Sequence, residues 1–342
     1  MGWSAEMKTT NLDLNSYRQL LKEYLLTNDE TALYQAEQFS RLSVKHNVPP
    51  EEMIQIHIEA LQDLYPELPR EINDSLNFLL EAMISYGLAL QENQFLREKQ
   101  SELESEISVA ANMQKTLLST VKPEVKGLDI GAISVPASTM NGDYYHFVTN
   151  KENHLGIALA DVIGKGIPAA LAMSMIKYSM DSFPESQQQP KAILENLNRV
   201  VERNVDPSMF ITMFYGLYNP ENETFAYASA GHEPCFYYHA SRNEFEEIYA
   251  PGLVLGVNND TNYQQFVRKI EKDDCLILLT DGVTECRLGE HFIEGKQILQ
   301  VIESFIHLPA QEAVEKVFCY FEKLQDFQLR DDFTLIIIKK EV

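Results

Sequence analysis

The stretch HLGIALADVIGKG, residues 154–166, joins an apolar run to an acidic residue and then to two glycines. The apolar run is typical of a buried strand, and Asp161 stands where that strand is expected to end. An unpaired buried carboxylate is costly, so an Asp at this place needs a partner. For one motif alone a turn is the simpler interpretation, because Asp and Gly are common turn residues.

Three further short acidic motifs lie beside strand-like sequence elsewhere in the chain. They are NGDYY at 141–145, LTDGVTE at 279–285 and RDDFTL at 330–335. Four such motifs beside strand-like sequence favour a shared cation site over four separate turns. Carboxylate oxygens with few nearby His or Cys are hard ligands, and they indicate Mg²⁺ or Mn²⁺ rather than Zn²⁺.

Composition narrows the class of protein. The 342 residues suggest about two domains, and the net charge of −23 argues against partners that are nucleic acids or anionic membrane surfaces. No segment has the pattern of a signal peptide or a membrane span. The four cysteines form no C-x-x-C pair, which indicates free thiols in a reducing compartment. We therefore expect a cytoplasmic protein.

Residues 1–90 are predicted to form a helical bundle. Apolar residues recur at helical spacing from residue 12, and the segment Thr27–Glu30 resembles a capping box that opens a second helix. Pro49 and Pro50 begin a third helix, and a fourth begins near Arg70. The residues of the second helix expected to face inward are Leu33, Ala36, Phe39 and Ser40. Short loops between amphipathic helices are typical of a bundle.

Residues 91–120 are predicted to be a linker helix, because the chain has no Pro or Gly from Gln91 to Leu118. A narrow apolar stripe of heptad type runs along it, formed by Leu96, Gln100, Leu103, Ile107, Ala110, Gln114 and Leu117. Such a stripe suits pairing with a second copy, as in a coiled coil, and the two Gln predict marginal pairing. The alternative is a solvated helix that packs on a neighbouring domain.

From Leu128 onward, apolar residues recur at every second position instead of at helical spacing. The predicted strands are Leu128–Val135, His154–Ile163, Ile211–Tyr218, Phe225–Ala230, Phe236–Tyr238, Cys275–Leu279 and Phe333–Ile338. The predicted helices are Pro168–Phe183, Ala192–Asn204, Lys296–Ile306 and Gln311–Phe327. Antiparallel runs of strands with helices in pairs indicate an α+β fold in residues 121–342, with a β-sandwich flanked by helix pairs.

Residues 122–342 resemble the PPM family of metal-dependent serine/threonine protein phosphatases. The nearer likeness is to its bacterial branch, which includes the sporulation phosphatase SpoIIE. The motifs that carry the resemblance are, in order, Gly142-Asp143, the segment 161–166, ASAGHEP at 228–234, Asp281-Gly282 and the segment 331–334. Each is weak alone, but their order and separation are specific. The helical N-terminus and the linker also resemble the stress-response phosphatases of this branch.

The resemblance implies a β-sandwich with two divalent ions, Mn²⁺ or Mg²⁺, that share a water near the strand ends. The implied catalytic and metal-ligating residues are Asp143, Asp161, Asp281 and Asp331, together with the main-chain carbonyl of Val162. Asp161 would bridge both ions. The resemblance gives the neighbouring Asp332 a supporting role behind the ligands.

Two departures from the family pattern concern phosphate and metal binding. Many relatives carry an Arg upstream of the first Asp, whereas residues 128–142 contain no Lys or Arg. Phosphate would then be held by the metals alone or by a basic residue such as Lys165. Glu285 stands where relatives often carry an Asp of a third metal site. We expect His232 to make structural hydrogen bonds beneath the site, and His57 to be a core or interface residue.

The implied function is a phosphoserine/phosphothreonine protein phosphatase that acts on a phosphorylated anti-sigma factor antagonist and so releases a general stress sigma factor. A switch kinase-like protein would activate it by binding the N-terminal domain, and the chain would be a homodimer. The alternatives are a non-catalytic scaffold that binds phosphoproteins and a small-molecule phosphohydrolase. A scaffold would be expected to have lost at least one Asp, and a small-molecule enzyme would not need a partner-binding domain.

Overall fold

The computed structural model describes residues 14–46, 48–150, 153–164, 166–184, 189–206, 208–288 and 291–341. The chain divides into two compact units, residues 1–103 and residues 104–342, which we call the N-terminal unit and the C-terminal unit. In the described ranges, no helix combines the length and the apolar character that crossing a bilayer would require.

The helices of the N-terminal unit begin where the sequence predicts. They are α1 (Leu14–Thr27), α2 (Glu30–Lys45), α3 (Pro50–Leu64) and α4 (Arg70–Leu117), the last of which continues into the C-terminal unit. The Asp29 side chain caps α2 by accepting a hydrogen bond from the amide of Thr31 at 3.1 Å. α1 packs on α2 and α3, and His57 of α3 forms a 2.8 Å hydrogen bond with the hydroxyl of Tyr17 of α1. His57 is therefore an interface residue between helices.

The inward face predicted for α2 is wrong in part. Leu33 is 51% exposed and Ser40 is exposed, whereas Ala32 and Ser43 are buried. Large apolar side chains of α4 are exposed as well, among them Phe78. The reason is that helical spacing identifies an apolar face but not which surface covers it. These faces remain open in the single chain.

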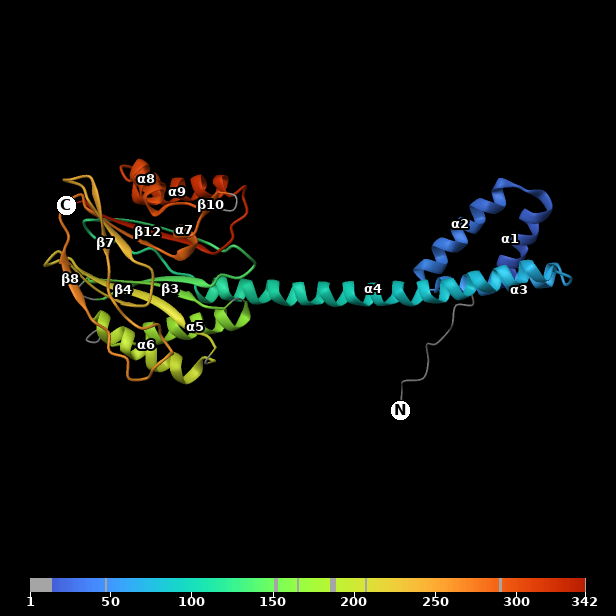
Figure 1. Cartoon of the computed structure of the whole chain (residues 1–342), viewed down its shortest axis with the longest axis horizontal. Coiled ribbons are helices and arrows are strands. Elements are labelled where there is room, and N and C mark those ends of the chain that lie inside the picture. The colour runs from blue at the N-terminus through green and yellow to red at the C-terminus, as the bar shows by residue number, and fades with distance from the viewer. Residues whose placement is uncertain are drawn as a thin grey trace. The chain divides into compact units, whose positions relative to one another are not determined.

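The C-terminal unit contains two five-stranded antiparallel sheets packed face to face (Figure 1). The first has the order β1-β12-β9-β6-β7, with β1 (Leu128–Val135), β12 (Phe333–Lys340), β9 (Cys275–Leu279), β6 (Cys235–His239) and β7 (Glu244–Ile248). The second has the order β2-β3-β4-β5-β8, with β2 (Asp143–Thr149), β3 (Leu155–Val162), β4 (Ile211–Asn219), β5 (Thr224–Ala230) and β8 (Phe266–Lys269).

Helix pairs cover the outer faces of the sandwich, which confirms the predicted α+β class. In Figure 1, α5 (Ile167–Asp181) and α6 (Pro190–Asn204) lie on the second sheet, and α8 (Gly295–Phe305) and α9 (Ala310–Leu324) lie on the first. Short elements complete the unit, namely α7 (Asp281–Thr284), β10 (Arg287–Leu288) and β11 (His291–Phe292). The strands β2, β7 and β8 were not predicted, because their polar or acidic residues hide the alternation of a strand.

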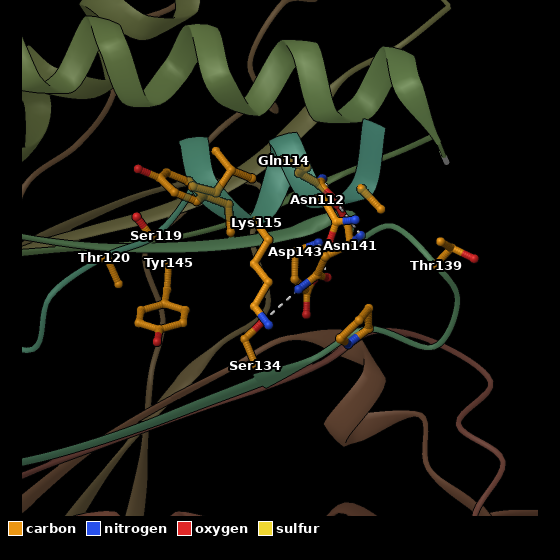
Figure 2. Close-up of a pocket in the computed structure, with 14 residues that line it drawn as sticks. Asn112, Gln114, Lys115, Ser119, Thr120, Ser134, Thr139, Asn141, Asp143 and Tyr145 are labelled. Carbon is orange, nitrogen blue, oxygen red and sulfur yellow. Dashed lines mark hydrogen bonds between the residues drawn. The ribbon is translucent and has the colours of Figure 1, made fainter. Parts of the chain in front are cut away.

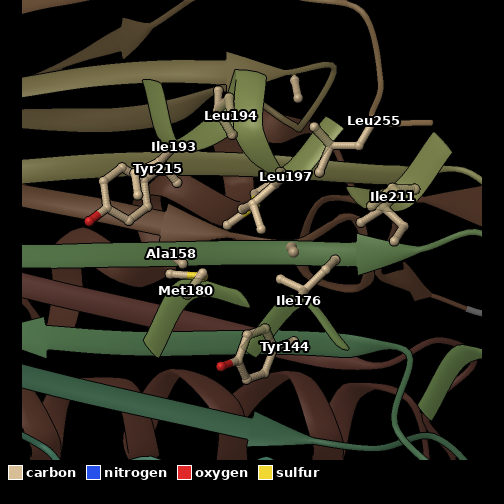
Figure 3. Packing of buried hydrophobic residues seen from close by; sticks show 14 of the residues in the cluster. Tyr144, Ala158, Ile176, Met180, Ile193, Leu194, Leu197, Ile211, Tyr215 and Leu255 are labelled. Atoms are coloured by element: carbon tan, nitrogen blue, oxygen red, sulfur yellow. The ribbon is translucent and has the colours of Figure 1, made fainter. Parts of the chain in front are cut away.

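Alternation along β3 divides its side chains between two layers. Leu155, Ile157 and Leu159 are fully buried between the sheets. Ala158 and Ala160 face the opposite way, in the cluster that α5 and α6 form against the second sheet (Figure 3). Burying one large aliphatic side chain stabilises the fold by roughly 1.5–3 kcal/mol. β3 is thus anchored on both faces, and the position of Asp161 at its end is fixed by the core.

Candidate active site

The acidic motifs meet at one end of the sandwich. Asp143 begins β2 and Asp161 lies near the end of β3, and the two residues are direct partners in the antiparallel register. Asp281 comes two residues after the end of β9, and the pair Asp331-Asp332 comes just before β12, the antiparallel neighbour of β9. Since β12 also contacts β2, the two sheets bring all five aspartates to a common edge.

Asp143 is the most buried of these carboxylates, with 3% of its surface exposed. Its Oδ2 accepts hydrogen bonds from the hydroxyls of Thr280 and Thr334, both at 2.7 Å. Burial raises the pKa of Asp143 well above the ordinary Asp value, and the charges of Asp161 and Asp332 raise it further. The two threonines were not among the predicted site residues, although each stands within one of the acidic motifs.

Asp332 binds the segment that precedes Asp143. Its Oδ1 accepts a hydrogen bond from the amide of Ala137 at 2.7 Å, and its Oδ2 accepts one from the amide of Gly142 at 2.5 Å. Both carboxylate oxygens are therefore engaged by backbone amides. The Asp331 carboxylate accepts a hydrogen bond from the amide of Asp332 at 3.0 Å.

Gly142 lets several oxygen atoms approach one another. A Cβ at this position would lie 3.2 Å from Asp332 Oδ2 and 3.6 Å from both Asp161 Oδ1 and the carbonyl oxygen of Val162. A larger residue would fill this cradle of oxygens. Carboxylate and carbonyl oxygens are the donors that Mg²⁺ and Mn²⁺ prefer, so the residues fit a divalent cation. Within the described ranges, no group of three or more His, Cys, Asp or Glu side chains forms a cage for a metal ion.

The carboxylates of the cluster repel one another. Burial, followed by the charges of Asp281, Asp331 and Asp332, raises the pKa of Asp161 to about 7. Burial, followed by the charges of Asp331 and Glu285, raises the pKa of Asp281 to about 6. A divalent cation would relieve this repulsion, so the cluster is electrostatically suited to bind one.

His232 lies beneath the cluster and is buried. Its Nδ1 forms a 2.9 Å hydrogen bond with the hydroxyl of Thr212, the residue of β4 that pairs with Asp161. Burial lowers the pKa of His232 to about 4, so the imidazole is neutral near pH 7. These contacts favour a structural role for His232.

A cavity of about 470 Å³ lies beside Asp143, between the end of α4 and the segment that joins β1 to β2 (Figure 2). Gln114 and Lys115 line it from α4, and Ser134 and Asn141 line it from the opposite side. Figure 2 shows the Lys115 side chain extending from the helix toward Ser134. Lys165, the basic residue that the sequence analysis considered for phosphate binding, lies outside the described residues.

Comparisons with known proteins identify the family. Residues 151–341 match the family described as Stage II sporulation protein E (SpoIIE), and residues 15–89 match the family described as the N-terminal domain of the phosphoserine phosphatase RsbU. The chain belongs to the SpoIIE-type branch of the PPM family of metal-dependent phosphatases.

The chain is 56% identical over 326 residues to the phosphoserine phosphatase RsbU of Bacillus subtilis (strain 168), which covers 95% of this chain and 97% of that protein. Among solved structures it is similar to the SiaA-PP2C domain of Pseudomonas aeruginosa, with a TM-score of 0.60, 18% identity and coverage of 70% and 98%. The RsbU and RsbW domains of a Mycobacterium tuberculosis protein give a TM-score of 0.53, 20% identity and coverage of 66% and 64%. These structures share the PP2C-like fold.

Proposed function

We propose that this chain is a cytoplasmic protein phosphatase that dephosphorylates a phosphoserine or phosphothreonine of an anti-sigma factor antagonist. The dephosphorylated antagonist then releases a general stress sigma factor. The observation that carries the proposal is the 56% identity to a phosphoserine phosphatase, because it extends over both units rather than over the catalytic domain alone.

The proposed metal ligands are Asp143, Asp161, Asp281, Asp331 and the carbonyl of Val162. In this assignment Asp161 would be shared by the two ions, and Asp332 would orient the ligands through its bonds to the amides of Ala137 and Gly142. The hydroxyls of Thr280 and Thr334 hold Asp143 through Oδ2, and Oδ1 would be left for a cation.

Bound Mn²⁺ or Mg²⁺ would activate a water for in-line attack on the phosphate and offset the charge of the phosphate oxygens. The chain's own contribution is to hold the carboxylates in place. Thr280 and Thr334 fix Asp143, and the register of β2 with β3 sets Asp161 opposite it. A rigid ligand set keeps the reacting groups aligned, which is the main contribution a protein makes to phosphoryl transfer.

We further propose that residues 1–90 form a dimeric regulatory domain that binds a switch kinase-like activator, that residues 91–120 are a linker, and that residues 121–342 are the phosphatase domain. Exposed apolar side chains on α2 and α4, such as Leu33, Phe78 and Leu103, support an interface there. A second copy would cover them.

Phosphate release tests the proposed activity. With Mn²⁺ present, we expect the full-length chain to release phosphate from a phosphoserine-bearing anti-sigma factor antagonist, and much more slowly from a small phosphomonoester. The reason is that a dedicated partner-binding domain favours a protein substrate. A matched antagonist with the phosphoserine replaced by Ala is the control. A chain that binds the phosphoprotein without turnover would be a scaffold, and equal rates on both substrates would favour a small-molecule phosphohydrolase.

Deletion of the N-terminal unit tests the proposed regulation. We expect a fragment of residues 104–342 to keep weak basal turnover and to lose its response to the activator, because the activator site would lie in the deleted part. Turnover is measured with and without the activator for the fragment and the full chain. If the fragment is activated as strongly as the full chain, the regulatory assignment is wrong.

A further inference from the structure

The last turn of α4 holds the segment that carries Asp143. Gln114 of this turn is 6% exposed. Its Nε2 donates a hydrogen bond to the backbone oxygen of Asn141 at 2.6 Å, and its Oε1 accepts one from the backbone nitrogen of Asn141 at 3.1 Å (Figure 2). One carboxamide therefore binds both backbone groups of one residue. Two such bonds fix the orientation of Asn141 as well as its position.

The side chain of Asn141 in turn holds the backbone of Asp143. Its Oδ1 accepts a hydrogen bond from the amide of Asp143 at 3.0 Å. Its Nδ2 donates a hydrogen bond to the hydroxyl of Ser134 at 2.8 Å. The backbone of Asp143 is thus positioned by a residue that Gln114 holds.

A chain of hydroxyl groups connects the same asparagine to the Asp143 carboxylate. The hydroxyls of Ser134 and Thr334 lie 2.9 Å apart, and Thr334 bonds to Asp143 Oδ2 at 2.7 Å. An ionised carboxylate, the form of Asp143 that would bind a cation, only accepts hydrogen bonds; Thr334 then gives its single hydroxyl proton to Asp143 and accepts from Ser134. Ser134 in turn accepts from Asn141. Each donor in this series points toward the Asp143 carboxylate. The series holds the carboxylate, while the Asn141 side chain holds the backbone amide of Asp143.

We propose that Gln114 is a positioning residue of the metal site. It fixes Asn141 and thereby prepares the Asp143 carboxylate to bind a divalent cation. The inference rests on the proposed metal-dependent function, and Gln114 itself is placed away from the reacting atoms. Residues that orient metal ligands typically change metal affinity by roughly 10- to 100-fold when they are replaced. Because Gln114 belongs to α4, displacement of the end of this helix would alter the metal site directly.

This role differs from the one that the heptad stripe predicts. As a stripe residue, Gln114 would face a second copy and weaken pairing, so its replacement by Leu would raise activity. In the structure Gln114 is buried against Asn141, whereas Leu103 and Leu117 of the same stripe are exposed. The stripe assignment of Gln114 is therefore wrong, and the two roles predict opposite effects for one substitution.

The experiment measures Mn²⁺ affinity of the full-length chain by calorimetry for wild type, Gln114→Leu and Gln114→Glu. Leu has a similar size but makes neither bond, and Glu can accept from the Asn141 amide but cannot donate to its carbonyl. We expect Gln114→Leu to weaken Mn²⁺ binding about 10- to 100-fold, and Gln114→Glu to weaken it less. At saturating Mn²⁺, kcat should return close to that of wild type, since Gln114 touches no reactant.

Asn112→Ala is the matched control, because Asn112 lies on the same part of α4, lines the same cavity and is exposed. It should bind Mn²⁺ as wild type does. Wild-type Mn²⁺ affinity in Gln114→Leu would overturn the proposal. This includes the case in which Gln114→Leu lowers only the thermal stability of the metal-free protein, measured in EDTA, and leaves Mn²⁺ affinity unchanged. If Gln114→Leu does not fold, wild-type affinity in Gln114→Glu would overturn it instead.

Asp161→Asn separates this inference from the proposed function. If Asp161→Asn loses Mn²⁺ binding while Gln114→Leu keeps it, only the role of Gln114 fails. If Asp161→Asn itself binds Mn²⁺ with wild-type affinity, the metal site is misplaced and the proposed function fails with it.

Discussion

Asp161→Asn is expected to abolish turnover and to leave the chain folded. Asp161 is the ligand assigned to both ions, and its neighbours Asp281 and Asp331 repel it in the metal-free protein. The neutral amide keeps the size of the side chain but loses the negative charge that would hold the ions. Metal ions supply several kcal/mol of transition-state stabilisation, so the loss should be at least on the order of 10³-fold in kcat/KM. Phosphate release and circular dichroism measure the two outcomes.

The same result is expected for Asp143→Asn, Asp281→Asn and Asp331→Asn. Asp332→Asn should be milder, because an amide oxygen can still accept one of the two backbone hydrogen bonds that Asp332 now receives. Wild-type rates in any two of the ligand variants at limiting metal would rule out the assignment. A larger loss in Asp332→Asn than in Asp331→Asn would mean that the ligand and its supporting neighbour are exchanged.

Chelation is the second change with a large expected effect. EDTA should remove all turnover, and Mn²⁺ should restore it more fully than Mg²⁺. Hard oxygen ligands admit both ions, but the strongly hydrated Mg²⁺ gives up its waters reluctantly. Full activity after exhaustive chelation would contradict a metal-dependent mechanism. A zinc chelator too weak to bind Mn²⁺ is the control, and it should leave the rate unchanged.

The affinity of the chain for Mn²⁺ should also depend on pH. The pKa of Asp161 is about 7 and that of Asp281 about 6 in the metal-free fold, both above the ordinary Asp value. A cation must displace these protons, so Mn²⁺ affinity should fall by up to about tenfold per pH unit for each proton displaced as the pH drops below 7. Calorimetry between about pH 6 and 8 measures this, and constant affinity would contradict it.

The raised pKa values of Asp161 and Asp281 also make the stability of the metal-free protein depend on pH. The folded chain binds protons that the unfolded chain has already released between pH 4 and 7, because the folded-state pKa values are raised. Stability from these groups is therefore fully present below pH 4 and is lost as the pH rises through 6 and 7. Saturating Mn²⁺ should remove this dependence.

The helix starts, most strands and the order of the acidic motifs can be predicted from the amino-acid sequence alone. Pro50 and Asp29 begin helices through local chemistry, and the strands Leu128–Val135 and Cys275–Leu279 follow from alternating or continuous apolar residues. These features depend on neighbours along the chain, so a sequence pattern records them. The family resemblance rests on the same local motifs, and the comparisons confirm it.

The residues that support the candidate ligands, by contrast, become evident only in the folded chain. β2 was not predicted, although it begins at Asp143, because its stability comes from pairing with β3 rather than from its own apolar pattern. Thr334 and Gln114 are separated from Asp143 by long or irregular stretches of chain, yet both belong to its hydrogen-bond network. Hydrogen bonds form between atoms that folding brings within about 3 Å, and no spacing along the chain encodes that proximity.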